Sequence, residues 1–449
     1  MRRAAGVARR MSIDRNVLRL ATRAGLLSIV GVLLITLGGR LLGFLREVLI
    51  SSLYGTSAIA DSFFTVQLVP TIVSSFLLGP LMIVYVPHYA ALQEAGTEEE
   101  ALVRTLRTGV RVGMLITAVM VVAGVSLALL NVGPVAEGRP LLGTFMVILA
   151  ISIVPLVVGG LATVILHARG RHLAAMAVAA LAPAGMLASL VLLTGVSVIG
   201  LVDALPWSFV AGSLFSALAG AISLRNQRRS TAADHRPTSS RPPRIGKFRR
   251  ELVASVMENI GFTVNQGLTI LLAASVGAGA VATNAYAFRI AAFAFSAIVS
   301  PLNQVVQTWM TGHPSRREGR KLFLVIGALA MVVAAISVGL ILVGRAIVEG
   351  VYLHGSFSIA DAARVTALLR PYGIYIGVTA LNQLMARYFF VQGQGAHYAT
   401  VMLAAYTIGN ILKVLLVETF GLEGLVWASV FAEGTALGYF ILYALRRSR

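Results

Sequence analysis

Long apolar runs, separated by short polar stretches, follow one another along almost the whole chain. A helix of about 20 apolar residues crosses the hydrocarbon core of a bilayer, whereas a barrel strand needs only about 10 residues. The runs here are about 20 to 30 residues long, and backbone groups in lipid must bond within the protein, so the runs predict helices. The pattern therefore predicts an all-α polytopic membrane protein of about 12 transmembrane helices. The predicted spans are 25–52, 60–87, 102–131, 140–167, 172–195, 198–224, 250–276, 281–310, 320–345, 362–390, 397–418 and 423–445.

The composition agrees with this class of protein. Of the 449 residues, 57% are hydrophobic and only 12% are charged, which is too little polar surface for a set of soluble domains. Cysteine is absent, which excludes disulfides, thiolate metal sites and cysteine nucleophiles. No phosphate-binding glycine loop, metal-ligand cluster or catalytic triad stands out in the sequence. We therefore expect a transporter rather than an enzyme, with neither a cofactor nor a bound metal.

Basic residues give the chain a formal charge of +19, and they concentrate between the apolar runs. They gather in the N-terminal segment, in the mid-chain stretch and in the tail, whereas loops such as "YGTSAIA" contain none. An excess of Lys and Arg is typical of the cytoplasmic loops of membrane proteins. We interpret the charge as a topology signal that places both termini in the cytoplasm, and not as a nucleic-acid site.

Two short sequence matches divide the chain into halves. The segment "YGTSAIADSFF" at 54–64 aligns with "VGAGAVATNAY" at 276–286, and "GRHLA" at 170–174 aligns with "GAHYA" at 395–399. The offsets of 222 and 225 residues are both close to half the chain length. A parallel repeat of six spans is typical of carriers with two lobes around a central cavity, which makes a transporter the leading class. The predicted parts are a basic N-terminus at 1–24, six-helix lobes at 25–224 and 250–445, a cytoplasmic linker at 225–249 and a tail at 446–449.

Several charged residues fall inside the predicted spans. Arg40 lies about 15 residues into the first span, which at about 1.5 Å per residue is near the bilayer midplane. A charge at that depth costs roughly 3 kcal/mol or more unless it meets a partner or an aqueous cavity. Arg46, Glu47 and Arg289 are candidates for the same cavity, although Arg46 and Glu47 could instead extend to the outer interface. Asp61 either joins this group or caps the second span.

The candidate cavity is thus mostly lined by arginine. The planar guanidinium binds phosphate in a bidentate manner and stays charged, so the predicted ligand is an anionic head group. A second set of polar residues in the later spans provides candidates for coupling or for interlobe ion pairs, in which Lys413 would pair with Glu258 or Glu433. This set comprises Glu258, Asn410, Lys413 and Glu433.

These residues resemble the MurJ (MviN) lipid II flippases of the multidrug/oligosaccharidyl-lipid/polysaccharide superfamily. The motifs that are similar are "GRLLGFLREVLISSLYGTSAIADSFFTVQLVP", "NAYAFRI" and "VEGVYLHGSFSIADAARVTALLRPY". The resemblance implies a carrier in a bacterial cytoplasmic membrane that moves an undecaprenyl-pyrophosphate-linked saccharide to the outer leaflet by alternating access. It also implies contact with the glycan-assembly machinery. The cavity residues of the family correspond here to Arg40, Arg46, Glu47, Asp61 and Arg289.

Two features differ from the family pattern. Ser74 and Ser75 stand where the family usually has two arginines, and about twelve spans are predicted where members typically have fourteen. Besides lipid II, the open alternatives are another polyprenyl-linked glycan and a small molecule exchanged by an antiporter of the same superfamily. A third alternative is a membrane scaffold without transport, which would tolerate the loss of Arg40 and Arg289.

Overall fold

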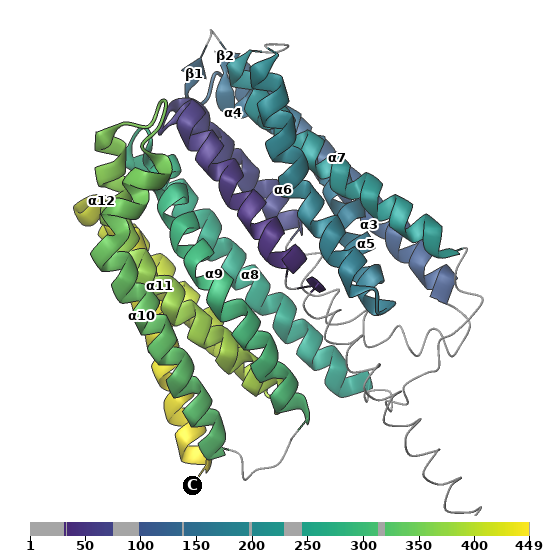
Figure 1. Ribbon diagram of the computed structural model, residues 1–449, viewed down its shortest axis with the longest axis vertical. Helices are drawn as coiled ribbons and strands as arrows, with labels where there is room; N and C mark the ends of the chain where they lie inside the picture. Colours follow the sequence, from purple (N-terminus) through teal and green to yellow (C-terminus); the bar gives the residue numbers. More distant parts are fainter. Residues whose placement is uncertain are drawn as a thin grey trace, which may run out of the picture.

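The computed structural model describes residues 31–32, 34–74, 98–136, 139–196, 200–228, 245–312 and 319–448. The predicted N-terminal segment, Ser75 and most of the predicted linker lie outside these residues. The described part is almost entirely helical and forms two lobes, which confirms the predicted all-α class (Figure 1). The boundaries of the predicted lobes, and the cytoplasmic position of both termini, stay predictions.

The helices follow the apolar runs closely. The first two helices cover 34–54 and Ala58–Ser74. A short antiparallel pair, β1 (Val135–Ala136) and β2 (Arg139–Pro140), lies between α3 and α4. The labelled helices are α3 (Glu98–Leu129), α4 (Leu141–Ala150), α5 (Ile153–Ala168), α6 (His172–Gly195), α7 (Leu201–Arg228), α8 (Ile245–Val276), α9 (Ala280–Gly312), α10 (Gly319–Tyr352), α11 (Ile359–Val391) and α12 (Gly395–Ser448).

Two breaks determine how these helices correspond to the predicted spans. α12 is kinked at Gly421, which has a φ of 54°, so it comprises two helical segments. α4 and α5 are bent by 43° and replace the single helix predicted at 140–167. Pro155 has no N–H to donate to the carbonyl of Ile151, which interrupts the helical hydrogen bonding at this point. Counted in this way, twelve described helical segments match the twelve predicted spans.

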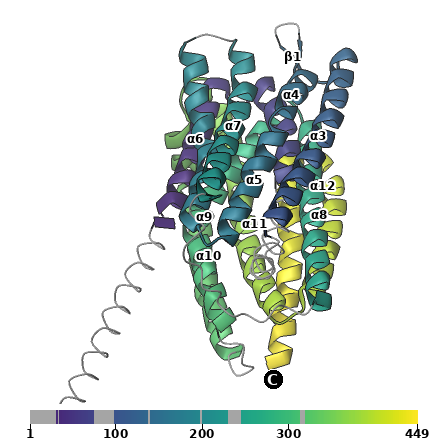
Figure 2. The ribbon, with the colours of Figure 1, turned by 90° about the vertical axis from the view of Figure 1, so that its right-hand side faces the viewer.

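The two lobes meet along the first helix, 34–54. Helices α3 to α7 pack against one another, α8 to α12 form a second packed group, and Figures 1 and 2 show both groups running along a common axis. A Cβ added at Gly39 would lie 2.9 Å from the Cβ of Ala180, so the first helix packs closely on α6. Its Phe44 stacks on Phe293 of α9 with the ring centroids 4.5 Å apart. The first helix therefore contacts both lobes.

The outer faces of the helices are apolar. Large hydrophobic side chains such as Leu115, Leu129 and Leu342 are exposed there. Six described helices are long and apolar enough to cross a membrane, or seven if the bent pair of α4 and α5 counts as one span. An apolar surface of this extent is unfavourable in water and suits hydrocarbon. The chain is a multi-pass membrane protein.

Candidate substrate-binding cavity

An interlobe ion-pair cluster surrounds Glu47 of the first helix. Arg46 donates from Nε to Oε1 of Glu47 at 2.8 Å, and Arg289 of α9 forms an ion pair with the other carboxylate oxygen. Glu47 is only 2% exposed, and a carboxylate buried to this degree is strongly destabilising unless a cation is beside it. Since Glu47 and Arg289 belong to different lobes, this cluster joins the lobes at their boundary. Arg46 and Glu47 thus face the interior.

Arg289 also contacts two residues of the second helix of the first lobe, Phe64 and Gln67. Its guanidinium donates to Oε1 of Gln67 at 3.0 Å and lies 4.6 Å from the ring centroid of Phe64. Gln67 is the residue that the 222-residue offset aligns with Arg289, and the same offset aligns Phe64 with Tyr286, whose rings are 5.5 Å apart. Repeat-equivalent residues therefore contact each other across the boundary between the two lobes.

Arg40 makes a further contact between the lobes. Its guanidinium donates to the backbone carbonyl of Ser296, on α9. The contact places Arg40 beside the same helix that holds Arg289, about two turns further along. The predicted cavity residues Arg40, Arg46, Glu47 and Arg289 are thus brought together by two helices, the first helix and α9.

These four residues line a cavity of about 510 Å³ between the lobes. Three arginines and one glutamate give its charged lining a net positive charge, which suits an anionic ligand. Ser74, at the position where the resemblance leads one to expect arginine, also lines this cavity. We call this space the arginine cavity. Among the described residues, no group of three His, Asp or Glu side chains could hold a metal ion.

Two smaller cavities adjoin the arginine cavity on the side of the second lobe. One of about 310 Å³ shares Arg40 and Ser296 with it, and another of about 210 Å³ shares Gln67 and Arg289. The three cavities therefore border one another at these shared residues, and we call them together the recess. The sequence did not single out Gln67 or Ser296, although the 222-residue offset from Arg289 would have identified Gln67.

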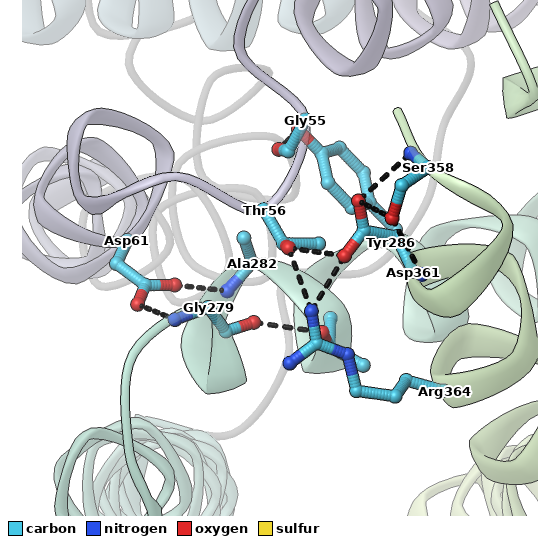
Figure 3. A network of polar contacts seen from close by, with 10 residues as sticks. Gly55, Thr56, Asp61, Gly279, Ala282, Tyr286, Ser358, Asp361 and Arg364 are labelled. Carbon is cyan, nitrogen blue, oxygen red and sulfur yellow. Dashed lines mark hydrogen bonds and ion pairs between the residues drawn. The ribbon is translucent and has the colours of Figure 1, made fainter. Parts of the chain in front are cut away.

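Asp61 lies away from the cavity, contrary to its predicted role as a cavity residue. Its carboxylate accepts hydrogen bonds from the backbone N–H groups of Gly279 at 2.5 Å and Ala282 at 2.7 Å (Figure 3). These donors stand at the start of α9, where helical N–H groups lack partners within the helix. The sequence offered a helix cap as the alternative role of Asp61, at the start of the second span. Asp61 does cap a helix, but this helix is α9 of the other lobe.

A second carboxylate, Asp361, lies close by in Figure 3. It accepts from the hydroxyl of Thr56 at 2.6 Å and from Arg364 at 2.5 Å, and it forms a capping box with Ser358 at the start of α11. Burial acts to raise the pKa of Asp361, but the hydrogen bonds from Thr56, Ser358 and Arg364 outweigh it, so that pKa lies below its ordinary value. Asp361 therefore stays ionised and holds Thr56 of the first lobe.

Backbone contacts complete this junction, which we call the clasp: the contacts of residues 52–61 with 279–286 and 355–364. The N–H of Ser356 donates to the carbonyl of Ser52 at 2.7 Å. Gly55 and Gly355 both have left-handed φ values, 52° and 61°, and a Cβ on either would lie within about 2.5 Å of a carbonyl oxygen of the other segment. Glycine is needed at both positions because of the conformation and the close approach.

Lys413 occupies a different environment inside the second lobe. Its ammonium is fully buried and donates to Oδ1 and the carbonyl of Asn265, at 2.5 and 3.1 Å, and to the hydroxyl of Thr269 at 2.8 Å. Both acceptor residues lie on α8, so Lys413 joins two helices of one lobe. The structure records no ion pair from Lys413 to Glu258 or Glu433 within the described ranges, so the expected pairing of these residues is not formed.

The remaining predicted coupling residues also lie in the second lobe. Glu433 is 1% exposed and accepts from Thr379 at 2.7 Å and from the amide of Asn382 at 3.4 Å. Its second carboxylate oxygen and Oδ1 of Asn410 are buried without a hydrogen-bond partner in the described part of the chain. Glu258 is half-buried on α8. The role of these residues in coupling stays a prediction.

Comparisons with known proteins agree with this architecture. The family model described as "Lipid II flippase MurJ" matches residues 50–449. A search of curated proteins gave no match. A structure of the lipid II flippase MurJ in an inward closed conformation aligns with a TM-score of 0.71 and 17% identity, over 91% of this chain and 86% of that one.

Transporters of the wider superfamily share the fold. An inward-facing multidrug resistance MATE transporter aligns with a TM-score of 0.73 and 16% identity, over 93% of this chain and 98% of that one. A superfamily transporter from Pyrococcus furiosus, described as having a binding pocket of reversed polarity, aligns with a TM-score of 0.69 and 16% identity, over 94% and 95% of the two chains. The structural likeness establishes the transporter fold of the superfamily. Because the family model covers most of the sequence, the chain belongs to the MurJ lipid II flippase family.

Proposed function

We propose that the protein moves an undecaprenyl-pyrophosphate-linked saccharide, lipid II or a related cell-envelope precursor, from the cytoplasmic to the outer leaflet of a bacterial cytoplasmic membrane. The observation that supports this most is the arginine cavity at the boundary between the lobes. Pyrophosphate is compact and polyanionic, and guanidinium groups bind such an anion with paired hydrogen bonds. The protein acts as a transporter, and the glycan-assembly machinery supplies or receives its cargo.

The charged residues of the cavity have distinct parts in this proposal. Arg40, Arg46 and Arg289 contact the pyrophosphate. Glu47 bridges Arg46 and Arg289 and partly neutralises them while the cavity is empty. Because Arg289 comes from the second lobe and Arg46 from the first, a bound pyrophosphate draws both lobes onto one ligand.

Alternating access requires that the lobes separate at one end and close at the other. The clasp joins the lobes at the end that carries Gly55, Gly279 and Gly355, which the charge pattern of the loops assigns to the outer side. The arginine cavity begins near the clasp, at Glu47 and Arg289, and extends away from it to Arg40, which lies 14 residues before Tyr54, or about 21 Å along the helix. The conformation is therefore closed at the outer side, and release of the cargo needs the clasp to open.

The complete absence of cysteine allows a direct test of clasp opening. In a Ser52→Cys, Ser356→Cys double variant, oxidation is expected to cross-link the clasp and stop transport, and reduction is expected to restore it. Each single variant is the control, because one cysteine cannot form the cross-link. Undiminished transport by the cross-linked protein would contradict opening at this end.

Complementation tests the function itself. In a bacterium depleted of its own lipid II flippase, we expect the wild type to restore growth, and Arg40→Ala and Arg289→Ala to fail although both variants insert stably. A well-expressed wild type that does not rescue would exclude lipid II. The substrate would then be another polyprenyl-linked glycan, the second candidate favoured by Ser74 in the cavity lining.

A further inference from the structure

We propose that the second-lobe side of the recess is a subsite for an uncharged saccharide, and that Gln266 and Gln383 determine its specificity. This inference rests on the proposed function, in which the arginine cavity holds a pyrophosphate. It adds a second, chemically different region to that site, formed by the two smaller cavities. We call these two smaller cavities together the neutral subsite.

The lining of the neutral subsite contrasts with that of the arginine cavity in charge. No carboxylate lines either of its two cavities, and its cations are Arg40 and Arg289, which it shares with the arginine cavity. Arg40 and Arg289 already contact the pyrophosphate in the proposed function, so a charged substituent placed deeper in this region would lose its hydration without gaining an ionic partner of its own. The region therefore selects for a group that is polar and uncharged.

Two side-chain amides face this space from opposite helices. Gln266 lies on α8 and Gln383 on α11, and both line the cavity of about 310 Å³. Neither amide makes a hydrogen bond to another described residue, whereas Asn284 nearby is already engaged by the hydroxyl of Tyr372 at 2.6 Å. A primary amide offers donors and acceptors together, which matches the dual character of sugar hydroxyls. The two glutamines are thus available for a neutral polyol.

Aromatic rings supply the apolar part of the subsite. Phe262 and Phe288 line both smaller cavities and are only partly buried. Phe288 is fixed by an edge contact with Tyr372, at a ring-centroid distance of 5.6 Å. Small-molecule sites commonly combine apolar and aromatic walls with a few placed polar groups. A pyranose ring has this dual character, with C–H faces and a hydroxylated rim.

The position of the neutral subsite fits the covalent order of a glycolipid. The first sugar is bonded directly to the pyrophosphate, so its site must border the site of the anion. Arg40 lines both the arginine cavity and the cavity that contains the two glutamines. An anion bound by Arg40 therefore directs its sugar toward Gln266 and Gln383. A free cationic drug would be repelled by the arginines that border this subsite.

Binding to three lipids tests the inference with the full-length protein in nanodiscs. The probes are undecaprenyl pyrophosphate, undecaprenyl-pyrophosphoryl-N-acetylglucosamine and lipid II. Undecaprenyl-pyrophosphoryl-N-acetylglucosamine is a glycolipid without a peptide. We expect the wild type to bind this peptide-free glycolipid about tenfold more tightly than undecaprenyl pyrophosphate, which is the factor expected from one or two neutral hydrogen bonds. Gln266→Ala and Gln383→Ala are expected to remove most of that preference and leave the binding of undecaprenyl pyrophosphate unchanged. The control, Thr407→Ala on the exposed face of α12, is expected to change neither.

The outcomes separate this inference from the proposed function. Equal wild-type affinity for the bare and the sugar-bearing lipid would overturn the saccharide subsite while the proposed function stands. A preference of more than about tenfold for lipid II over the peptide-free glycolipid would overturn the proposal that the subsite takes an uncharged group, because the stem peptide of lipid II carries carboxylates. Failure of the wild type to bind any of the three lipids would overturn the proposed function, and this inference with it.

Discussion

Arg289 and Lys413 are both basic residues inside helices of the second lobe, the first half-buried and the second fully buried, and their surroundings differ. The ammonium of Lys413 has three N–H donors and three fixed oxygen acceptors, all on α8, and it lines none of the three described cavities. Arg289 has five N–H donors, pairs with Glu47 of the other lobe and lines a cavity. Burial of a charge is therefore not enough to identify a binding site. The partners of that charge decide whether it has donors left for a ligand.

The strongest test of this contrast is Arg289→Ala. Because the variant removes a charge-assisted contact to pyrophosphate, we expect affinity for undecaprenyl pyrophosphate to fall about a hundredfold. Transport in proteoliposomes should fall with it, while the fold is retained because Arg46 stays paired with Glu47. Arg345→Ala is the matched control, because Arg345 is 77% exposed and pairs only with its helical neighbour Glu349 among the described residues. Unchanged affinity in Arg289→Ala would contradict the role of the arginine cavity.

Lys413→Met should show the opposite behaviour. Methionine keeps the apolar stem but leaves Asn265 and Thr269 without their shared donor, which should cost about 2 kcal/mol of stability. We expect a lower melting temperature in detergent and unchanged affinity for undecaprenyl pyrophosphate. A variant of wild-type stability that loses affinity would show that Lys413 takes part in the site.

Arg289→Lys sharpens the comparison because it keeps the positive charge and removes the planar guanidinium group. A lysine has one point charge and cannot contact Glu47, Gln67 and a pyrophosphate in one plane. We expect about a tenfold loss of affinity, between that of the wild type and that of Arg289→Ala. Wild-type affinity in the lysine variant would mean that charge alone is recognised.

Asp61→Asn tests whether a buried carboxylate outside the cavity helps to keep the clasp closed. The amide is a weaker acceptor for the N–H groups of Gly279 and Ala282, so we expect the clasp to weaken by about 1 kcal/mol. The Ser52→Cys, Ser356→Cys pair should then cross-link more slowly, with binding of undecaprenyl pyrophosphate retained. An unchanged cross-linking rate would show that Asp61 does not hold the clasp closed.

Part of the site could be predicted from sequence because charge inside a long apolar run is conspicuous. The depth of Arg40, and the position of Arg289 away from both helix ends, identified both residues as candidates for an interior site. Asp61 was open to two interpretations, because a carboxylate at a helix start is common and its acceptor role depends on what lies opposite. In the fold, Gly279 and Ala282 of the other lobe lie opposite it.

The sequence by itself determined the all-helical class, the approximate ends of the spans and the repeat, because hydrophobic length and periodicity are local properties. It could not determine that Glu47 pairs with Arg289 or that Lys413 is saturated by Asn265 and Thr269. These contacts join residues more than 140 positions apart, and only the packing of helices sets which ones face each other. The tertiary structure therefore decided which buried charges are free to meet a ligand.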